Sequence, residues 1–201
     1  MKKNHFFAML FRMKYIIRWQ LMCNTRIEND SEHSLEVAYI AHALGVINNT
    51  IYKGNLNAER LALLGMYHDA TEIITGDMPT PVKYYSKEIR KAYTEVENVA
   101  KEQLLTGLPE EMQGAYAPLL GPSKEEEKLW IYVKAADKIS ALIKCIEEEH
   151  KGNHDFDDAK DTISAYIEKI DLPEVKYYMK HFMPAFSMTL DKSGTNRRKN
   201  V

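Results

Sequence analysis

The chain has 201 residues, a formal net charge of −2 at pH 7 and 45% hydrophobic residues. This length suffices for one domain with a substantial core, while the near-neutral charge argues against long nucleic acid or a membrane surface as a partner. Apolar runs stay shorter than the roughly 18 residues of a membrane span, and Cys23 and Cys145 lack CxxC spacing, so we expect a cytoplasmic protein.

Apolar residues recur at helical rather than alternating spacing, which predicts an all-α fold. The first helix covers roughly residues 4–16, and its charged residues favour an amphipathic helix over a signal peptide. Asp30 or Ser31 can cap the second helix, which carries EHSLEVAYIAHALGVIN. A third helix begins after Asn57, continues through HDATEIIT and stops at Gly76, beyond which two prolines impose an extended loop.

The second half of the chain continues this helical pattern. Further helices are expected near 86–105, 109–119, 156–169 and 173–189. The segment SKEE from Ser123 has capping-box spacing ahead of EKLWIYVKAADKISALIKCIEEEH, which predicts another helix. Because repeats and linkers are absent from the sequence, we expect one domain over residues 1–190 and a polar, frayed tail over 191–201.

Four side chains on three predicted helices could bind one metal ion. His68 and Asp69 are adjacent, so they differ by about 100° around a helix and can reach the same atom beside it. His33 lies in the first turn of its helix, and Asp137 interrupts an apolar pattern at a core-facing position. Mixed imidazole and carboxylate ligands suit one divalent cation such as Co, Mn, Fe or Zn.

Each of these residues also has an ordinary structural explanation. A His-Asp pair occurs by chance on solvated helix faces, His33 could be a capping or partly buried histidine, and Asp137 could belong to a salt bridge. The order His33, then His68 and Asp69, then Asp137 places the candidates on three predicted helices. This order favours a metal site, because helices that converge on one ion would each supply at least one ligand.

These segments together resemble the HD-domain metal-dependent phosphohydrolases, whose signature is His, then His-Asp, then Asp on successive helices. FFAMLFRMKYIIRW, SEHSLEVA, MYHDATEIITGDMPTPVKYY and KAADKISALIKCIEE look like the bacterial 5′-deoxynucleotidases, over nearly the whole chain except the tail. The resemblance implies a compact helical bundle, usually a homodimer, that needs a divalent cation. It also implies a phosphoric monoester hydrolase acting on deoxyribonucleoside 5′-monophosphates.

Glu72 and Arg18 are the candidate catalytic side chains. On a continuous helix Glu72 would share one side with His68 and Asp69, so it could act as general base or proton shuttle. A solvated carboxylate at the helix end, or a partner of a metal ligand, is the alternative. Arg18 has a planar fork that could hold two phosphate oxygens, unless it is an ordinary surface arginine.

The remaining candidates would contact the substrate. Trp19 could form a wall against the sugar or base, although a tryptophan after an amphipathic helix is usually part of the core. The resemblance implies that Arg18 and Trp19 contact substrate, and His33 is predicted to contact both substrate and metal. The loop after Gly76 would supply further sugar or phosphate contacts through Asp77, Met78, Pro79 and Thr80.

Two other functions remain open from the sequence. An HD phosphohydrolase for a triphosphate, cyclic nucleotide or alarmone would need more positive charge than one Arg near the site, which favours a monophosphate. A non-catalytic helical module with a structural metal would have no use for Glu72 or Arg18. The metal, the base preference, the oligomeric state and the division of proton transfer between Glu72 and Asp77 stay open.

Overall fold

The computed structural model describes residues 4–83, 85–123, 126–189 and 192. Within these ranges the regular structure is helical, and the only β feature is an isolated bridge between Ile17 and Asn29. The all-α prediction is therefore confirmed. None of the helices in this part of the chain is both long and apolar enough to cross a membrane.

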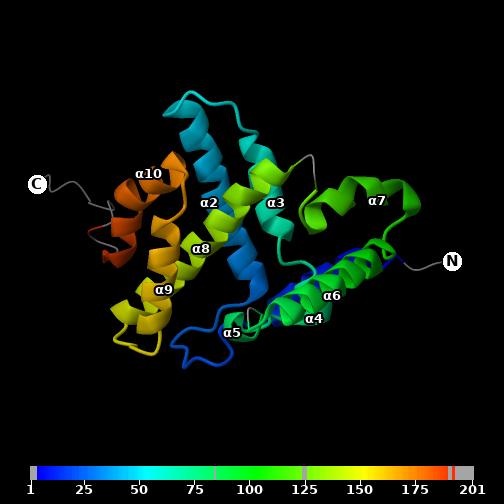
Figure 1. Cartoon of the computed structure of the whole chain (residues 1–201), viewed down its shortest axis with the longest axis horizontal. Coiled ribbons are helices and arrows are strands. Elements are labelled where there is room, and N and C mark those ends of the chain that lie inside the picture. Colours follow the sequence, from blue (N-terminus) through cyan, green and yellow to red (C-terminus); the bar gives the residue numbers. More distant parts are fainter. Residues whose placement is uncertain (1–3, 84, 124–125, 190–191, 193–201) are drawn as a thin grey trace, which may run out of the picture.

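The helices follow one another along the chain, and residues 16–29 form a longer irregular segment between the second and third of them. In order they are α1 (Phe6–Leu10), the 3₁₀ helix η1 (Phe11–Tyr15), α2 (Asp30–Thr50), α3 (Ala58–Tyr67), α4 (Glu72–Thr75), α5 (Thr80–Lys83), α6 (Lys87–Leu105), α7 (Glu110–Tyr116), η2 (Ala117–Leu120), α8 (Glu127–His150), α9 (Asp157–Glu168), α10 (Pro173–His181) and η3 (Met183–Ser187). Figure 1 shows α2 and α8 crossing at the centre, with α9 and α10 on one side and α6 and α7 on the other.

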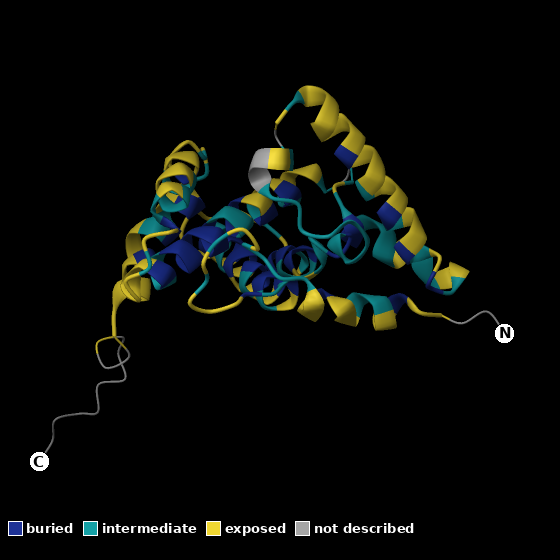
Figure 2. Cartoon of the chain, turned by 90° about the horizontal axis from the view of Figure 1, so that it is seen from below, coloured by how far each residue is buried: buried dark blue, intermediate teal, exposed yellow. Residues whose placement is uncertain are grey.

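The main hydrophobic core lies where α2, α3 and α8 pack together. Leu44, Leu61 and Ile139, one from each helix, are fully buried in it. Figure 2 shows the buried residues gathered along the middle of the molecule, with exposed residues on the outer faces of the helices. Because each of these three helices leads to a candidate metal ligand, the core fixes the positions of those ligands relative to one another.

α2 and α3 approach each other closely at Gly65. A Cβ atom there would lie 2.8 Å from the Cα of Ala38, nearer than real Cβ contacts come. Glycine is therefore needed for the close approach of the two helices. This contact sits three residues before His68, so it also sets how far the end of α3 lies from α2.

The predicted helix through HDATEIIT is interrupted, which corrects the sequence interpretation. α3 ends at Tyr67, residues 68–71 form turns and α4 begins at Glu72. The backbone N–H of Ala70 bonds the carbonyl of Tyr67 at 3.0 Å, and that of Glu72 bonds Asp69 at 2.9 Å. These bonds span three residues rather than four, so they tighten the chain and turn the following side chains away from α-helical spacing.

The segment after α4 also differs from the predicted extended loop. Gly76 ends α4 as expected, with a φ of 72° that favours glycine. Only residues 76–79 are irregular, because the short helix α5 starts at Thr80. Pro81 is tolerated there, since the first turn of a helix does not need its missing N–H.

Two predicted helix caps are wrong. The side chain of Asn29, not Asp30 or Ser31, accepts bonds from the N–H groups of Ser31 and Glu32, at 3.0 and 3.1 Å. Asp30 is fully buried beside Arg18 instead. α8 starts after Glu126 without a side-chain cap, so Ser123 does not begin a capping box. The Glu126 carboxylate pairs with Arg60, while residues 124–125 lie outside the described part of the chain.

The other predicted helices are confirmed, with changes at their ends. The helices expected at 4–16, 109–119 and 173–189 each finish as a 3₁₀ turn, namely η1, η2 and η3. Such tightening is common at helix ends. The predicted tail, residues 191–201, lies outside the described residues apart from Lys192.

Candidate active site

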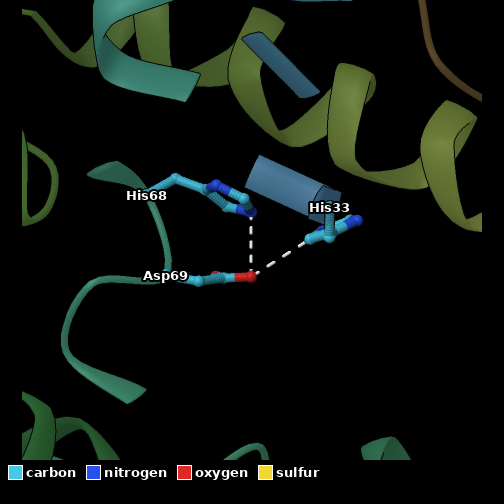
Figure 3. A group of neighbouring side chains, drawn as sticks. All are labelled: His33, His68 and Asp69. Carbon is cyan, nitrogen blue, oxygen red and sulfur yellow. Dashed lines mark ion pairs between the residues drawn. The ribbon is translucent and has the colours of Figure 1, made fainter. Parts of the chain in front are cut away.

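Two imidazoles and a carboxylate meet where the start of α2 faces the end of α3. The Nε2 atom of His68 lies 3.0 Å from Oδ2 of Asp69, and Nε2 of His33 lies 3.7 Å from the same oxygen. Figure 3 shows the three side chains pointing toward one another. Their ligand atoms all lie within 4.8 Å of each other, a spacing at which one metal ion could bind them.

The opposite nitrogen of each imidazole is held by the protein. Nδ1 of His68 lies 2.8 Å from the Gly65 carbonyl, and Nδ1 of His33 lies 3.1 Å from the Ser140 hydroxyl. A carbonyl oxygen can only accept, so His68 carries its proton on Nδ1 and directs Nε2 to the shared oxygen of Asp69. Both Nε2 atoms are buried without a hydrogen-bond partner among the described residues. This arrangement is typical of metal-binding histidines.

Asp137 reaches the same imidazole from α8. Its Oδ1 lies 3.2 Å from Nε2 of His33, and its Oδ2 accepts a bond from Lys138 at 3.0 Å. Burial and the Arg18 charge lower the pKa of His33, but contacts with Asp137 and Glu28 outweigh them and raise it to about 9. The surrounding carboxylates therefore favour a positive charge at this position, as a metal site requires.

Arg18 is largely buried and faces the metal-binding group. Its Nη1 atom donates to Oδ2 of Asp69 at 3.2 Å and lies 3.6 Å from Oδ1 of Asp30. The side chain is only 13% exposed, so the alternative of an ordinary surface arginine is wrong. The guanidinium therefore directly adjoins one of the candidate metal ligands.

Glu72 belongs to a second group of carboxylates, with Asp30 and Asp69. Ligand atoms of these three residues also lie within 4.8 Å of one another. Burial, together with the negative charges of Asp69 and Asp30, raises the pKa of Glu72 to about 11. Its Oε2 atom is buried without a hydrogen-bond partner among the described residues. The structure thus brings Glu72 to the site despite the break in the helix.

Trp19 adjoins this group through an unusual backbone conformation. Its φ is 58°, in the left-handed region that bulky residues rarely adopt. The indole Nε1 donates to Oε2 of Glu28 at 2.9 Å, and the ring packs on Phe156 with centroids 5.3 Å apart. Trp19 is half-buried as a whole residue.

The segment that follows α4 stays near the carboxylates, since burial and then nearby negative charges, that of Asp77 among them, raise the pKa of both Asp30 and Glu72. Asp77 is partly buried, which raises its pKa against the opposing charge of Arg18. Met78 and Pro79 follow it and are also partly buried. The side chain of Thr80 lies outside what the structure describes. The substrate contacts predicted for these four residues stay predictions.

Comparison with known proteins identifies the chain's relatives. The sequence model of a family described as 5′-deoxynucleotidase YfbR-like matches residues 5–186. The chain belongs to this family. The 5′-deoxynucleotidase VP0926 of Vibrio parahaemolyticus is 51% identical over 193 residues, which cover 96% of this chain and 99% of that protein.

Solved structures show the same fold. An HD-domain phosphohydrolase from Listeria innocua matches with a TM-score of 0.76 and 28% identity, over 90% of this chain and 88% of that one. A cyanophage S-2L HD phosphohydrolase, DatZ, solved with dA and one catalytic Zn²⁺ ion, matches with a TM-score of 0.63 and 18% identity, over 90% and 96% of the two chains. The predicted HD-domain bundle is therefore confirmed.

Sequence reasoning missed two buried carboxylates of this 5′-deoxynucleotidase-family site. Glu28 contacts Trp19, Arg18 and His33, and Asp30 lies between Arg18 and Glu72. The only signal was the acidic pair within RIENDSEHS, which is equally typical of a helix start. Nothing in the spacing indicates that both side chains turn inward.

Proposed function

We propose that the chain hydrolyses deoxyribonucleoside 5′-monophosphates to deoxyribonucleoside and phosphate at the site around His33, His68 and Asp69. The chain is a 5′-deoxynucleotidase, a phosphoric monoester hydrolase, by its family and by relatives of that name at about half identity over nearly the whole length. One observation supports placing the reaction here: two buried Nε2 atoms that have no hydrogen-bond partner among the described residues converge on the Asp69 carboxylate, which also contacts the largely buried Arg18.

A metal site at these residues fits the side chains present. We infer that His33, His68, Asp69 and Asp137 hold one divalent cation, because ligand atoms of the first three lie within 4.8 Å of one another and Oδ1 of Asp137 lies 3.2 Å from Nε2 of His33. When bound, the cation polarises a phosphoryl oxygen and lowers the pKa of a bound water. The cyanophage relative has one catalytic Zn²⁺. Mixed imidazole and carboxylate ligation also suits Co, Mn or Fe.

Arg18 and Glu72 have separate roles in this proposal. Arg18 binds the phosphate, since its guanidinium points at Asp69 and can present two parallel N–H groups to phosphate oxygens. Glu72 would accept the proton of the attacking water at Oε2, a buried oxygen without a hydrogen-bond partner among the described residues, because a cation bound beside it would lower its raised pKa and leave it ionised. It could then return this proton to the departing sugar oxygen. Asp77 is the alternative proton carrier.

The sugar would lie beside Trp19. With the phosphate on Arg18, the neighbouring indole forms a rigid wall that leaves no room for a 2′-hydroxyl. His33 and the loop residues predicted above would complete the substrate contacts, the loop residues being Asp77, Met78, Pro79 and Thr80.

We also infer a homodimer in the cytoplasm, built from one domain over residues 1–190. Exposed aromatic side chains on the first helical segment support a contact surface there. Phe11 is 68% exposed and Tyr15 is 66% exposed. Patches of this kind commonly bind a second copy of the chain.

Phosphate release from a panel of nucleotides tests the proposed function. The protein is stripped with chelator, reloaded with single divalent metals and assayed on matched deoxy- and ribonucleoside mono-, di- and triphosphates. We expect metal-dependent release from deoxynucleoside monophosphates. Faster release from triphosphates would favour the other HD phosphohydrolases. Tight metal binding without hydrolysis of any substrate would favour the structural module.

A further inference from the structure

The chain between η1 and α2 forms a turn whose two ends are joined beside the active site. The N–H of Arg18 donates to the carbonyl of Glu28 at 3.0 Å, and the N–H of Asp30 donates to Ile16 at 3.1 Å. Arg18 and Glu28 are therefore neighbours across the base of the turn. We call residues 16–29 the substrate turn, because it carries both Arg18 and Trp19.

The Glu28 carboxylate touches three side chains of the site. Its Oε2 accepts the indole N–H of Trp19 at 2.9 Å. Its Oε1 lies 3.4 Å from Nδ1 of His33 and 3.9 Å from Nε of Arg18. Glu28 is 8% exposed, so water has little access to these contacts. One buried carboxylate thus links the candidate sugar wall, phosphate clamp and metal ligand.

Glu28 stands behind the site rather than in it. It faces Nδ1 of His33, whereas the metal-binding group faces Nε2 on the opposite side of the imidazole. It also approaches Arg18 at Nε, while Nη1 is the atom directed at Asp69. Glu28 is therefore not placed to contact the metal or the phosphate directly. Any effect of Glu28 on the reaction must act through Trp19, Arg18 or His33.

The backbone of Trp19 needs such external support. A φ of 58° in a bulky residue persists only where surrounding contacts over-determine it. The Trp19 carbonyl accepts bonds from the N–H of Met22 and from Nδ2 of Asn24, both at 3.0 Å. These two bonds hold the main chain. The bond to Glu28 fixes the orientation of the indole itself.

We propose that Glu28 is a positioning residue that sets sugar selectivity by fixing the Trp19 indole and the Arg18 guanidinium relative to His33. This inference rests on the proposed function, in which the indole excludes the 2′-hydroxyl. A steric wall distinguishes deoxyribose from ribose only while it is rigid, because an indole ring that can tilt makes room for the 2′-hydroxyl of a ribonucleotide. Without the Glu28 carboxylate, Trp19 keeps its bulk and loses its fixed orientation.

Four variants separate these contributions. Glu28→Ala removes every contact of the carboxylate, while Glu28→Gln keeps an oxygen that can accept the indole N–H. Trp19→Phe deletes the donor from the other end of the same bond and keeps an aromatic ring. Glu32→Gln is the matched control, because Glu32 is a half-exposed acid in the first turn of α2 that pairs with Arg26, and glutamine can still accept the capping bond from the N–H of Asn29.

The first readout is the ratio of kcat/KM for a deoxy- and a ribonucleoside 5′-monophosphate with the same base. We expect Glu28→Ala to lower this ratio on the order of tenfold, the effect of losing a hydrogen bond to a charged acceptor. Glu28→Gln should restore most of the ratio, and Glu32→Gln should leave it unchanged. Adding Glu28→Ala to Trp19→Phe should change the ratio little further, since both substitutions remove the same hydrogen bond between Trp19 and Glu28. Metal content should stay that of the wild type.

The second readout needs neither metal nor substrate. The chain has two tryptophans, so a ¹⁵N-labelled sample gives two indole N–H signals, and Trp19→Phe assigns them by loss of one. In Glu28→Ala the Trp19 signal should shift and exchange faster with water, while that of buried Trp130 stays in place.

The outcomes distinguish this inference from the proposed function. A wild-type protein that does not hydrolyse deoxynucleotides contradicts the function, whatever the variants do. An active wild type with an unchanged sugar ratio in folded, metal-loaded Glu28→Ala overturns the role of Glu28. If Glu28→Ala does not fold, an unchanged ratio in Trp19→Phe overturns it equally, because that variant lacks the same hydrogen bond.

Discussion

A second buried glutamate, Glu148 on α8, anchors the substrate turn from outside, and its removal should destabilise the protein. Its carboxylate accepts the N–H of Thr25 at 2.9 Å, the N–H of Arg26 at 3.2 Å and Nδ2 of Asn153 at 2.8 Å. It also pairs with Lys144, which donates to the Arg26 carbonyl at 2.5 Å. Glu148 is fully buried, so water cannot replace these bonds.

The size of the effect follows from what each substitution leaves behind. Glu148→Ala leaves the buried ammonium of Lys144 without its carboxylate, which costs about 3–5 kcal/mol of the free energy of unfolding. Glu148→Gln keeps one acceptor but turns an amide N–H₂ toward other donors, so we expect a loss of about 1–3 kcal/mol. Glu149→Gln is the control, because the exposed pair of Glu149 with Lys160 contributes less than about 1 kcal/mol.

The loss of unfolding free energy caused by substituting Glu148 should also depend on pH. Burial raises the pKa of Glu148, but bonds from Lys144, Thr25 and Asn153 outweigh it and hold the pKa well below the usual value. A lowered pKa in the folded state gives stability that is present above the unfolded pKa, about 4.3, and is lost as pH falls. The difference between wild type and Glu148→Gln should therefore be full at pH 7 and shrink below about pH 4.

Urea unfolding measures these differences through the midpoint at constant slope. Because the substrate turn carries Arg18 and Trp19, folded Glu148→Gln should also show a higher KM with a smaller change in kcat. A Glu148→Ala protein as stable as Glu149→Gln would refute the anchoring argument. A gap between wild type and Glu148→Gln that stays constant from pH 7 to pH 3 would refute its electrostatic basis.

Three further predictions concern the site itself. His68→Ala and Asp69→Ala should lose metal and activity together, as metal analysis and phosphate release would show, whereas full metal content with normal turnover would exclude them as ligands. Glu72→Ala should keep its metal and bind nucleotide but lose on the order of 10²- to 10⁴-fold in kcat; loss of metal instead would make Glu72 a ligand. Trp19→Ala should narrow the deoxy-to-ribo ratio of kcat/KM with the metal retained, and an unchanged ratio in a variant that still melts cooperatively would rule out the wall.

The helices could be predicted from the sequence because their apolar spacing continues over several turns. Core residues such as Leu44, Leu61 and Ile139 follow this spacing, so α2, α3 and α8 were expected where they lie. The close approach of the four proposed metal ligands could be expected for a related reason. Asp137 stands at a core-facing position of an apolar helix, where a carboxylate needs a partner, and the structure places it 3.2 Å from His33.

The details that failed depend on contacts distant in sequence. Asn29 and Asp30 are equally good capping residues by local sequence. Asn29 caps α2 because the side chain of Asp30 is buried and lies beside Arg18 instead. Local spacing likewise could not show that the chain tightens between Tyr67 and Glu72. Glu28 looks like any loop acid until the turn closes and places it against Trp19 and His33.

The central claim is that His33, His68, Asp69 and Asp137 hold a cation at which Arg18 presents the phosphate. Anomalous X-ray diffraction from crystals of the Glu72→Ala variant, loaded with Co²⁺ and a deoxynucleoside 5′-monophosphate, tests it most directly. We predict one strong anomalous peak bonded by the two Nε2 atoms and the two aspartates, with the phosphate between it and Arg18. A cobalt peak with other ligands, or a phosphate bound away from Arg18, would contradict the claim.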